Sequence, residues 1–183
     1  MNIFISGGCK NGKSMYAQRL AKEMADAEGT KLYYIATMIP TDEEDRRRIA
    51  RHIDDRSGWG FETLEQGCDI CNLLDGGADK KGAFLLDSVT ALLSNEMFKR
   101  DGICNLKAGQ KVAEELTEFA RGTGNTVFVS DYIYSDARIF DEYTEAYREA
   151  LAYVDRRLAG VCDQVIEVAY GNIYYYNKER ENG

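Results

Sequence analysis

Residues 2–14 read NIFISGGCKNGKS, and the fold of the chain can be inferred from this segment. The apolar run Asn2–Ser6 is typical of a buried strand, and an amphipathic helix is predicted over Ser14–Ala27. Between them the chain fits the phosphate-loop pattern G-x4-G-K-[ST] at every fixed position. The residues of the loop are Gly7, Gly8, Cys9, Lys10, Asn11, Gly12, Lys13 and Ser14. A strand, a glycine-rich loop and a helix in this order predict a binding site for a nucleoside triphosphate.

The physical chemistry of phosphate binding explains this arrangement. Glycines let the loop fold with its backbone amides pointing inward, which makes a nest for anions. The amino terminus of the following helix adds a partial positive charge. Lys13 is expected to reach the β- and γ-phosphates, and the Ser14 hydroxyl to ligate Mg²⁺.

Short apolar runs alternate with longer amphipathic stretches along the rest of the chain. Strands are predicted at Lys31–Ala36, Phe61–Leu64, Gly82–Leu86, Thr126–Ser130, Val165–Ala169 and Ile173–Tyr176, the last two around a turn at 170–172. Helices are predicted at Asp42–Ile53, Val89–Phe98, Lys107–Arg121 and Asp141–Ala159. This alternation indicates an α/β fold with a mostly parallel sheet covered on both faces. We expect one P-loop nucleotide-binding domain over residues 1–183, a three-layer sandwich with a C-terminal antiparallel edge hairpin.

The composition argues against several functional classes. The chain has 183 residues and a formal net charge of −8, whereas a broad nucleic-acid-binding surface needs positive potential. No apolar run approaches the roughly 18–20 residues of a membrane span. Five cysteines without an export signal indicate reduced thiols and a cytoplasmic protein. Cys68 and Cys71 have CxxC spacing but lack further ligands, so we interpret them as two helix residues without a metal.

Asp87 directly follows the apolar run GAFLL. In a P-loop protein, an acid at the end of a core strand holds Mg²⁺ directly or through water. We interpret Asp87 as that acid, with Ser14 as the other metal ligand. The alternative is that Asp87 caps the next helix, a role that Ser88 fills equally well.

The single histidine, His52, lies in the basic stretch RRRIARHIDDR at residues 46–56. One interpretation is a solvated surface residue on a charged helix. The other is chemical, because neighbouring arginine charges disfavour protonation and keep the imidazole a neutral nucleophile. A histidine that attacks a phosphorus atom forms a covalent nucleotidyl intermediate.

Together these motifs resemble the bifunctional adenosylcobinamide kinase / adenosylcobinamide-phosphate guanylyltransferase family of cobalamin biosynthesis. The likeness covers about residues 1–100, and the ordered set of motifs carries it. After the phosphate loop the matching segments are Tyr34–Thr37, Asp42 with Glu44, Arg48-Ile49-x-x-His52 with Arg56, Phe61–Glu65, and Leu85–Thr90 with Asn95.

This resemblance implies two linked transfer reactions. Members of the family phosphorylate adenosylcobinamide with ATP or GTP, then transfer GMP from GTP to the new phosphate through a guanylylated histidine. His52 stands at the position of that histidine, and Lys13 would neutralise the charge that develops during transfer. The implied nucleotide contacts outside the phosphate loop are Ala36, Thr37, Met38, Ile53, Asp54, Asp55, Arg56, Glu65 and Asp87. The resemblance also implies a corrinoid substrate, Mg²⁺ and a homo-oligomer, a trimer.

Three places differ from the family pattern: Ile53 replaces a lysine, residues 152–155 read AYVD in place of Gly-x-x-Asn, and the third is a loop. Residues 131–136 read DYIYSD, where the family usually has Asn-Glu-Val-Gly and then Gly-Ile-Val-Pro. This difference keeps two alternatives open, a monofunctional small-molecule kinase and a nucleotide-binding regulator without catalysis. Intact Lys13, Ser14, Asp87 and His52 favour an enzyme.

Overall fold

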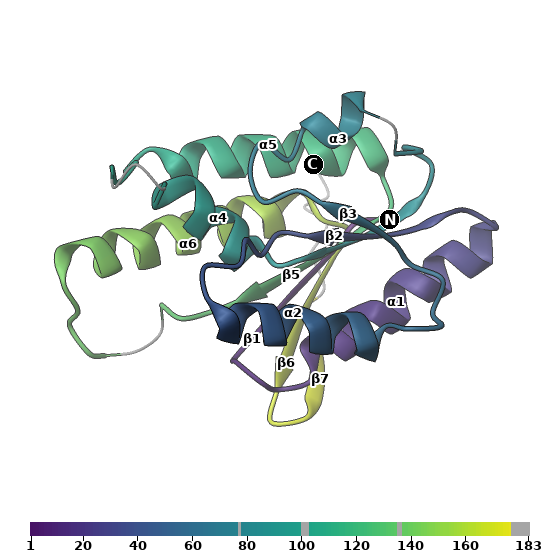
Figure 1. Cartoon of the computed structure of the whole chain (residues 1–183), viewed down its shortest axis with the longest axis horizontal. Coiled ribbons are helices and arrows are strands. Elements are labelled where there is room, and N and C mark those ends of the chain that lie inside the picture. Colours follow the sequence, from purple (N-terminus) through teal and green to yellow (C-terminus); the bar gives the residue numbers. More distant parts are fainter. Residues whose placement is uncertain (77, 100–102, 135–136, 177–183) are drawn as a thin grey trace, which may run out of the picture.

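The computed structural model describes residues 1–76, 78–99, 103–134 and 137–176, so Ser135 and Asp136 of the divergent segment lie outside it. In these ranges seven strands form one sheet in the order β3-β2-β4-β5-β1-β6-β7 (Figure 1). The strands are β1 (Ile3–Gly7), β2 (Leu32–Ala36), β3 (Glu62–Glu65), β4 (Ala83–Asp87), β5 (Thr126–Asp131), β6 (Gln164–Ala169) and β7 (Asn172–Tyr176). Neighbours are parallel except β6 and β7, which confirms the predicted parallel sheet with an antiparallel edge.

Six helices connect the strands in the described part of the chain. They are α1 (Lys13–Glu28), α2 (Glu43–Asp55), α3 (Asn72–Asp75), α4 (Val89–Met97), α5 (Ala108–Thr123) and α6 (Glu142–Val161). The predicted helices agree with these to within two residues at each end, and the short α3 was not predicted. Side-chain caps explain several starts: Asp42, Ser88 and Asp141 each accept a hydrogen bond from a backbone amide in the first turn.

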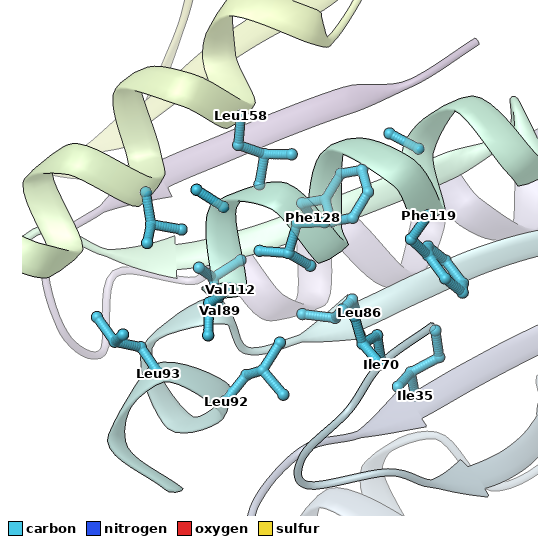
Figure 2. Packing of buried hydrophobic residues seen from close by; sticks show 14 of the residues in the cluster. Ile35, Ile70, Leu86, Val89, Leu92, Leu93, Val112, Phe119, Phe128 and Leu158 are labelled. Carbon is cyan, nitrogen blue, oxygen red and sulfur yellow. The ribbon is translucent and has the colours of Figure 1, made fainter. Parts of the chain in front are cut away.

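Helices cover both faces of the sheet, as the three-layer prediction requires (Figure 1). On one face, α1 packs Ala17, Ala21 and Ala25 against alternate side chains of the central strands. On the other face, α4, α5 and α6 enclose a larger core in which Leu86 and Phe128 of the strands meet the helices (Figure 2). Alternate strand residues therefore enter two separate cores, because successive side chains point to opposite faces.

The C-terminal hairpin is tighter than predicted. Ala169 pairs directly with Asn172, so the loop contains two residues, Tyr170 and Gly171. Their φ angles are 52° and 77°, the left-handed values of a type I′ turn, whose twist matches that of the strands.

The interpretation of the CxxC pair as helix residues is wrong. Cys68 lies in a bend after β3, and Cys71 is the residue immediately before α3. This segment stays a loop because its backbone is bound from outside: the amide of Asp69 donates to the carboxylate of Glu96 at 2.9 Å.

Candidate functional site

The phosphate loop leaves β1 with a backbone that only certain residues can adopt. Gly7 is the last residue of β1, and a Cβ there would collide with the carbonyl oxygen of Val168 on β6. Lys10 and Gly12 have φ angles of 56° and 89°. Alternating right- and left-handed residues turn backbone amides toward one concave side, which is the geometry of an anion nest.

Lys13 begins α1 and turns back over the loop. Its ammonium donates to the carbonyl oxygen of Gly8 at 3.1 Å and pairs with the carboxylate of Asp131 at the end of β5. The side chain of Lys13 is 7% exposed. The loop therefore holds one buried positive charge beside its amides, where the phosphate-loop pattern requires it.

Ser14 and Asp87 come together although 73 positions separate them in the sequence. The Ser14 side chain hydrogen-bonds to the Asp87 carboxylate, which also accepts a hydrogen bond from the Tyr34 hydroxyl at 3.2 Å. Burial raises the pKa of Asp87, against the opposing effects of the His52 charge and the Ser14 and Tyr34 hydrogen bonds. Ser88 caps α4 by accepting from the Ala91 amide, so the capping role considered for Asp87 is not needed.

This pair fits a magnesium ion that also binds phosphate oxygens. The described residues contain no group of three or more His, Cys, Asp or Glu side chains that could hold a metal ion by themselves. Mg²⁺ prefers oxygen ligands and commonly takes only one or two from the protein, with the rest from phosphates and water. A hydroxyl and a carboxylate in mutual contact at the mouth of a phosphate loop meet that requirement.

The turn after β2 is fixed by hydrogen bonds to the neighbouring segments. The buried Thr37 hydroxyl donates to the Ser88 carbonyl oxygen at 2.8 Å and accepts from the Ser88 amide at 2.7 Å. The Asn95 amide group donates to the carbonyl oxygens of Thr37 and Gly67, at 2.7 and 2.9 Å. Ala36, Thr37 and Met38 are therefore held against the strand end that carries Asp87.

The carboxyl end of α2 borders a hollow of about 480 Å³. Arg56 lines it and is 7% exposed, with its guanidinium 4.0 Å from the centre of the Tyr34 ring and a hydrogen bond of 3.3 Å to the Thr63 hydroxyl. Ile53 and Asp54 line the same hollow. Three of the four predicted contacts at 53–56 thus share one concave surface; the side chain of Asp55 lies outside the described part.

His52 lies in the last turn of α2, a helix whose other side chains are mostly exposed. His52 itself is partly buried, and it lies close enough to Asp87 for an electrostatic interaction that lowers the pKa of that acid. The fold thus brings the histidine within electrostatic reach of the predicted metal ligand, a relationship that a remote surface residue would not have.

Glu65 is the predicted site residue that lies apart from the phosphate loop. It ends β3, which stands four strand positions from β1. At the usual spacing of about 4.8 Å between strands, this separation is roughly 19 Å. The exposed carboxylate of Glu65 therefore lies too far from the phosphate loop to contact a phosphate held there.

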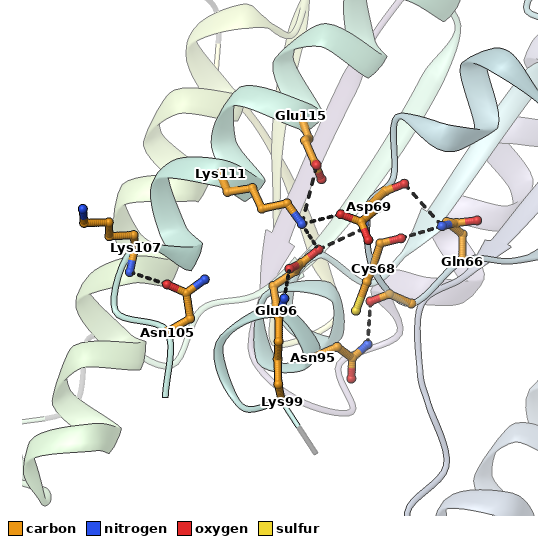
Figure 3. Close-up of polar contacts among 11 residues, drawn as sticks. Gln66, Cys68, Asp69, Asn95, Glu96, Lys99, Asn105, Lys107, Lys111 and Glu115 are labelled. Atoms are coloured by element: carbon orange, nitrogen blue, oxygen red, sulfur yellow. Dashed lines mark hydrogen bonds and ion pairs between the residues drawn. The ribbon is translucent and has the colours of Figure 1, made fainter. Parts of the chain in front are cut away.

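The loop after Glu65 is tied to the helices by a polar cluster (Figure 3). Buried Glu96 on α4 pairs with Lys111 on α5 at 2.5 Å, and Lys111 also pairs with Asp69 at 2.5 Å. Glu115 lies 3.7 Å from the same ammonium. One lysine thus pairs with three acids and fixes the loop that follows β3.

Two side chains of the site escaped prediction as site residues. Tyr34 joins Arg56 to Asp87, and Asp131 pairs with Lys13. Tyr34 looks like an ordinary strand residue in the sequence. For Asp131 the sequence offered a signal, because this acid ends a core strand just as Asp87 does. The local sequence did not show which strand would lie beside the phosphate loop.

A comparison with protein families shows the relationship of the chain. The model of the family described as cobinamide kinase / cobinamide phosphate guanyltransferase matches residues 3–174. The chain belongs to this family. This confirms the relationship predicted from the first hundred residues and extends it over nearly the whole chain.

Curated relatives agree with the family assignment. The "Bifunctional adenosylcobalamin biosynthesis protein CobP" of Pseudomonas aeruginosa is 28% identical over 165 residues, covering 90% of this chain and 91% of the relative. The "Bifunctional adenosylcobalamin biosynthesis protein CobU" of Salmonella typhimurium is 24% identical over 181 residues, covering 93% and 97%. Members of the family are kinases and guanylyltransferases, so the chain falls among transferases.

Solved structures confirm the fold class. A KaiC-like protein from Pyrococcus horikoshii has a TM-score of 0.50 at 12% identity, covering 98% of this chain and 79% of that one. At such identity the likeness concerns the fold alone. No helix in the described ranges combines the length and apolar character needed to cross a membrane.

Proposed function

We propose that this protein phosphorylates adenosylcobinamide and then transfers GMP from GTP to the phosphate, as its family does. One observation carries the proposal: Lys13, Ser14 and Asp87 gather at the phosphate loop, with His52 in electrostatic reach. A site for phosphoryl transfer alone has no need of a histidine there. A nucleotidyl transfer through a covalent intermediate requires one nucleophile, and His52 is the only histidine of the chain.

We assign nucleotide binding to the residues that line the strand ends. The amides of Gly7–Ser14 and the Lys13 ammonium would bind the phosphates. Ser14 and Asp87 would hold Mg²⁺, which neutralises phosphate charge during transfer. Arg56, with Ile53 and Asp54, would contact the nucleotide from the hollow at the carboxyl end of α2. Glu65 would bind the nucleoside. GTP is the guanylyl donor, and ATP or GTP the phosphoryl donor.

The guanylyl transfer takes place in two steps. An imidazole nitrogen of His52 attacks the α-phosphorus of GTP, the bond from that phosphorus to the bridging oxygen breaks, and pyrophosphate leaves with the electron pair. A phosphate oxygen of adenosylcobinamide phosphate then attacks the same phosphorus and displaces the histidine. Lys13 and the loop amides stabilise the charge that develops in both steps.

Labelling tests the covalent step. GTP labelled on the α-phosphate should leave acid-labile label on the wild-type protein, and His52→Asn should abolish it while Glu114→Ala, on the exposed side of α5, should not. Wild-type protein should also transfer label from the γ-phosphate of ATP or GTP to adenosylcobinamide. Label that survives in His52→Asn would refute the role of His52. Kinase activity without any guanylylation would show that the protein is a monofunctional kinase.

We also propose that residues 1–183 act as one domain in a cytoplasmic homo-oligomer, a trimer as in the family. Family membership supports this assembly. Light scattering on the purified protein measures its mass, and a monomeric mass at enzymatically active concentrations would contradict the proposal.

A further inference from the structure

Asp131 has a fixed backbone position beside the phosphate loop. It ends β5 and pairs in register with Gly7, the first residue of the loop. Its amide donates to the Thr90 hydroxyl at 2.9 Å, and the next amide, that of Tyr132, donates to the Gly7 carbonyl oxygen at 3.3 Å. The carboxylate therefore extends from a strand end that is hydrogen-bonded to its neighbours rather than from a free loop.

The side chain of Asp131 carries a negative charge to the place where phosphates are expected. It pairs with the Lys13 ammonium, whose side chain is 7% exposed, whereas the Asp131 side chain is 25% exposed. Burial is the main cause of the raised pKa of Asp87 on the adjacent β4, and the negative charge of Asp131 adds to it. Asp131 thus acts on both the phosphate-loop lysine and the proposed metal ligand, and a ligand can reach it.

The family pattern has asparagine at this position, so the aspartate changes the charge of the site. An asparagine amide would leave the positive charge of Lys13 intact, whereas the carboxylate of Asp131 cancels it. The phosphate-loop lysine contacts the β- and γ-phosphates of a bound nucleotide. A carboxylate and a phosphate oxygen are both negative acceptors and cannot hydrogen-bond to each other. A phosphate that reaches Lys13 must therefore share the ammonium with Asp131 or displace it.

The charge of the ligand decides how strongly this carboxylate opposes binding. A free nucleoside triphosphate carries the full negative charge of its phosphates, and a bound Mg²⁺ ion offsets part of that charge. The repulsion between two charges grows with their product, and near a protein surface it is stronger than in bulk water. Asp131 therefore repels a free triphosphate more strongly than it repels the magnesium complex of the same triphosphate.

We propose that Asp131 is a specificity-determining residue, which makes the phosphate loop select the magnesium complex of a nucleoside triphosphate over the free triphosphate. The inference rests on the proposed function, because it takes the phosphates to bind at Lys13 and Mg²⁺ to bind at Ser14 and Asp87. Transfer chemistry does not require the carboxylate, since the family pattern has an amide there. The aspartate instead adjusts which form of the nucleotide the loop accepts.

The experiment measures the binding of a GTP analogue with a methylene bridge between the α- and β-phosphorus, which His52 cannot cleave. Isothermal titration calorimetry at low ionic strength, with excess Mg²⁺ or with EDTA, gives two dissociation constants for each variant. We expect the ratio of Kd without Mg²⁺ to Kd with Mg²⁺ to be larger in wild type than in Asp131→Asn by roughly tenfold or more. Added salt should reduce this difference, because it screens partly exposed charges.

Two further variants separate the charge of Asp131 from other effects of its replacement. Asp26→Asn is the matched control, because Asp26 also pairs with a lysine, Lys22, but on the exposed surface of α1. This variant should keep the wild-type ratio of the two dissociation constants. Asp131→Glu retains the negative charge and should keep most of the preference for the magnesium complex.

Two results would overturn the inference. One is the same ratio in Asp131→Asn as in wild type. The other is a parallel loss of affinity for both forms in Asp131→Asn, which would show that the carboxylate only holds Lys13 in place.

The proposed function fails in a different way. Binding of the corresponding adenosine analogue but not of the guanosine analogue would contradict guanylyl transfer from GTP, and the ratio measured with the adenosine analogue would still decide the role of Asp131. A wild-type protein that binds neither analogue would refute both the proposed function and this inference.

Discussion

The guanidinium of Arg56 stacks on the ring of Tyr34 at 4.0 Å, while the hydroxyl of the same tyrosine donates to Asp87 at 3.2 Å. One strand residue thereby joins the hollow at the carboxyl end of α2 to the end of β4. Because Tyr34 and Arg56 are both buried, the contact fixes how the carboxyl end of α2 meets the sheet.

Replacing Arg56 with lysine should destabilise the protein and weaken nucleotide binding together. A lysine ammonium cannot stack flat on the ring, and a desolvated cation–π contact contributes about 1–2 kcal/mol. Urea unfolding should record that loss, and GTP titration should show weaker binding. Arg46→Lys, an exposed arginine on the same helix, is the control and should change neither. An unaltered unfolding midpoint for Arg56→Lys would contradict the structural role of the stack.

Removing the ammonium of Lys13 should reduce GTP affinity more than it reduces stability. A hydrogen bond to a charged group contributes about 1.5–3 kcal/mol, which is roughly a 10- to 150-fold change in affinity. Lys13→Ala should therefore raise the Kd for GTP by at least tenfold in a fluorescence titration. Lys22→Ala, on the exposed side of α1, should bind GTP like wild type. Equal affinities in both variants would be incompatible with phosphate binding by Lys13.

The polar cluster around Glu96 should depend on one lysine far more than on the other (Figure 3). Lys111→Met would leave the buried Glu96 carboxylate without its close partner, and breaking such a pair costs about 3 kcal/mol. Lys99 lies 3.9 Å from Glu96 and is 52% exposed, so Lys99→Met should cost less than about 1 kcal/mol. Denaturant unfolding of the two variants measures the difference. Similar losses in both would show that the cluster does not hold the loop at 66–70.

The buried carboxyl of Asp155 should make stability fall as the pH rises. Burial raises its pKa from 3.8 to about 7, although the Ser130 and Tyr134 hydroxyls donate to it at 3.1 Å and oppose the shift. Between pH 4 and 7 the unfolded chain has lost this proton and the native protein still holds it, so ionisation favours unfolding. For one group this amounts to at most about 4 kcal/mol.

Asp155→Asn removes that titration. Its unfolding free energy relative to wild type should increase from pH 5 to pH 8, because only wild type is destabilised over this interval. Chemical unfolding at the two pH values gives the comparison. Asp163→Asn, a surface acid that accepts from the Asn2 amide, serves as the control and should not reproduce the change. A difference that stays constant between pH 5 and 8 would disprove the raised pKa.

The sequence predicted most elements because their signals are local. Core strands such as β1 and β4 are apolar runs bounded by polar residues, and in the long helices apolar residues recur with helical spacing. The bounds of both therefore differ from prediction by one or two residues. The prediction for the segment 66–71 was wrong for the opposite reason. Its conformation depends on Glu96 and Lys111, which lie in distant helices, and nothing between Cys68 and Cys71 carries that information.

The sequence alone predicted that a triphosphate site begins at Gly7 and includes Ser14 and Asp87, and it indicated which family the chain resembles. These conclusions rest on spacing along the chain, which fixes the shape of a loop or the end of a strand. Only the tertiary structure decided the partners across the sheet: Asp131 beside Lys13, Tyr34 between Arg56 and Asp87. Strand order sets those contacts, and strand order follows from the packing of the whole core rather than from any one segment.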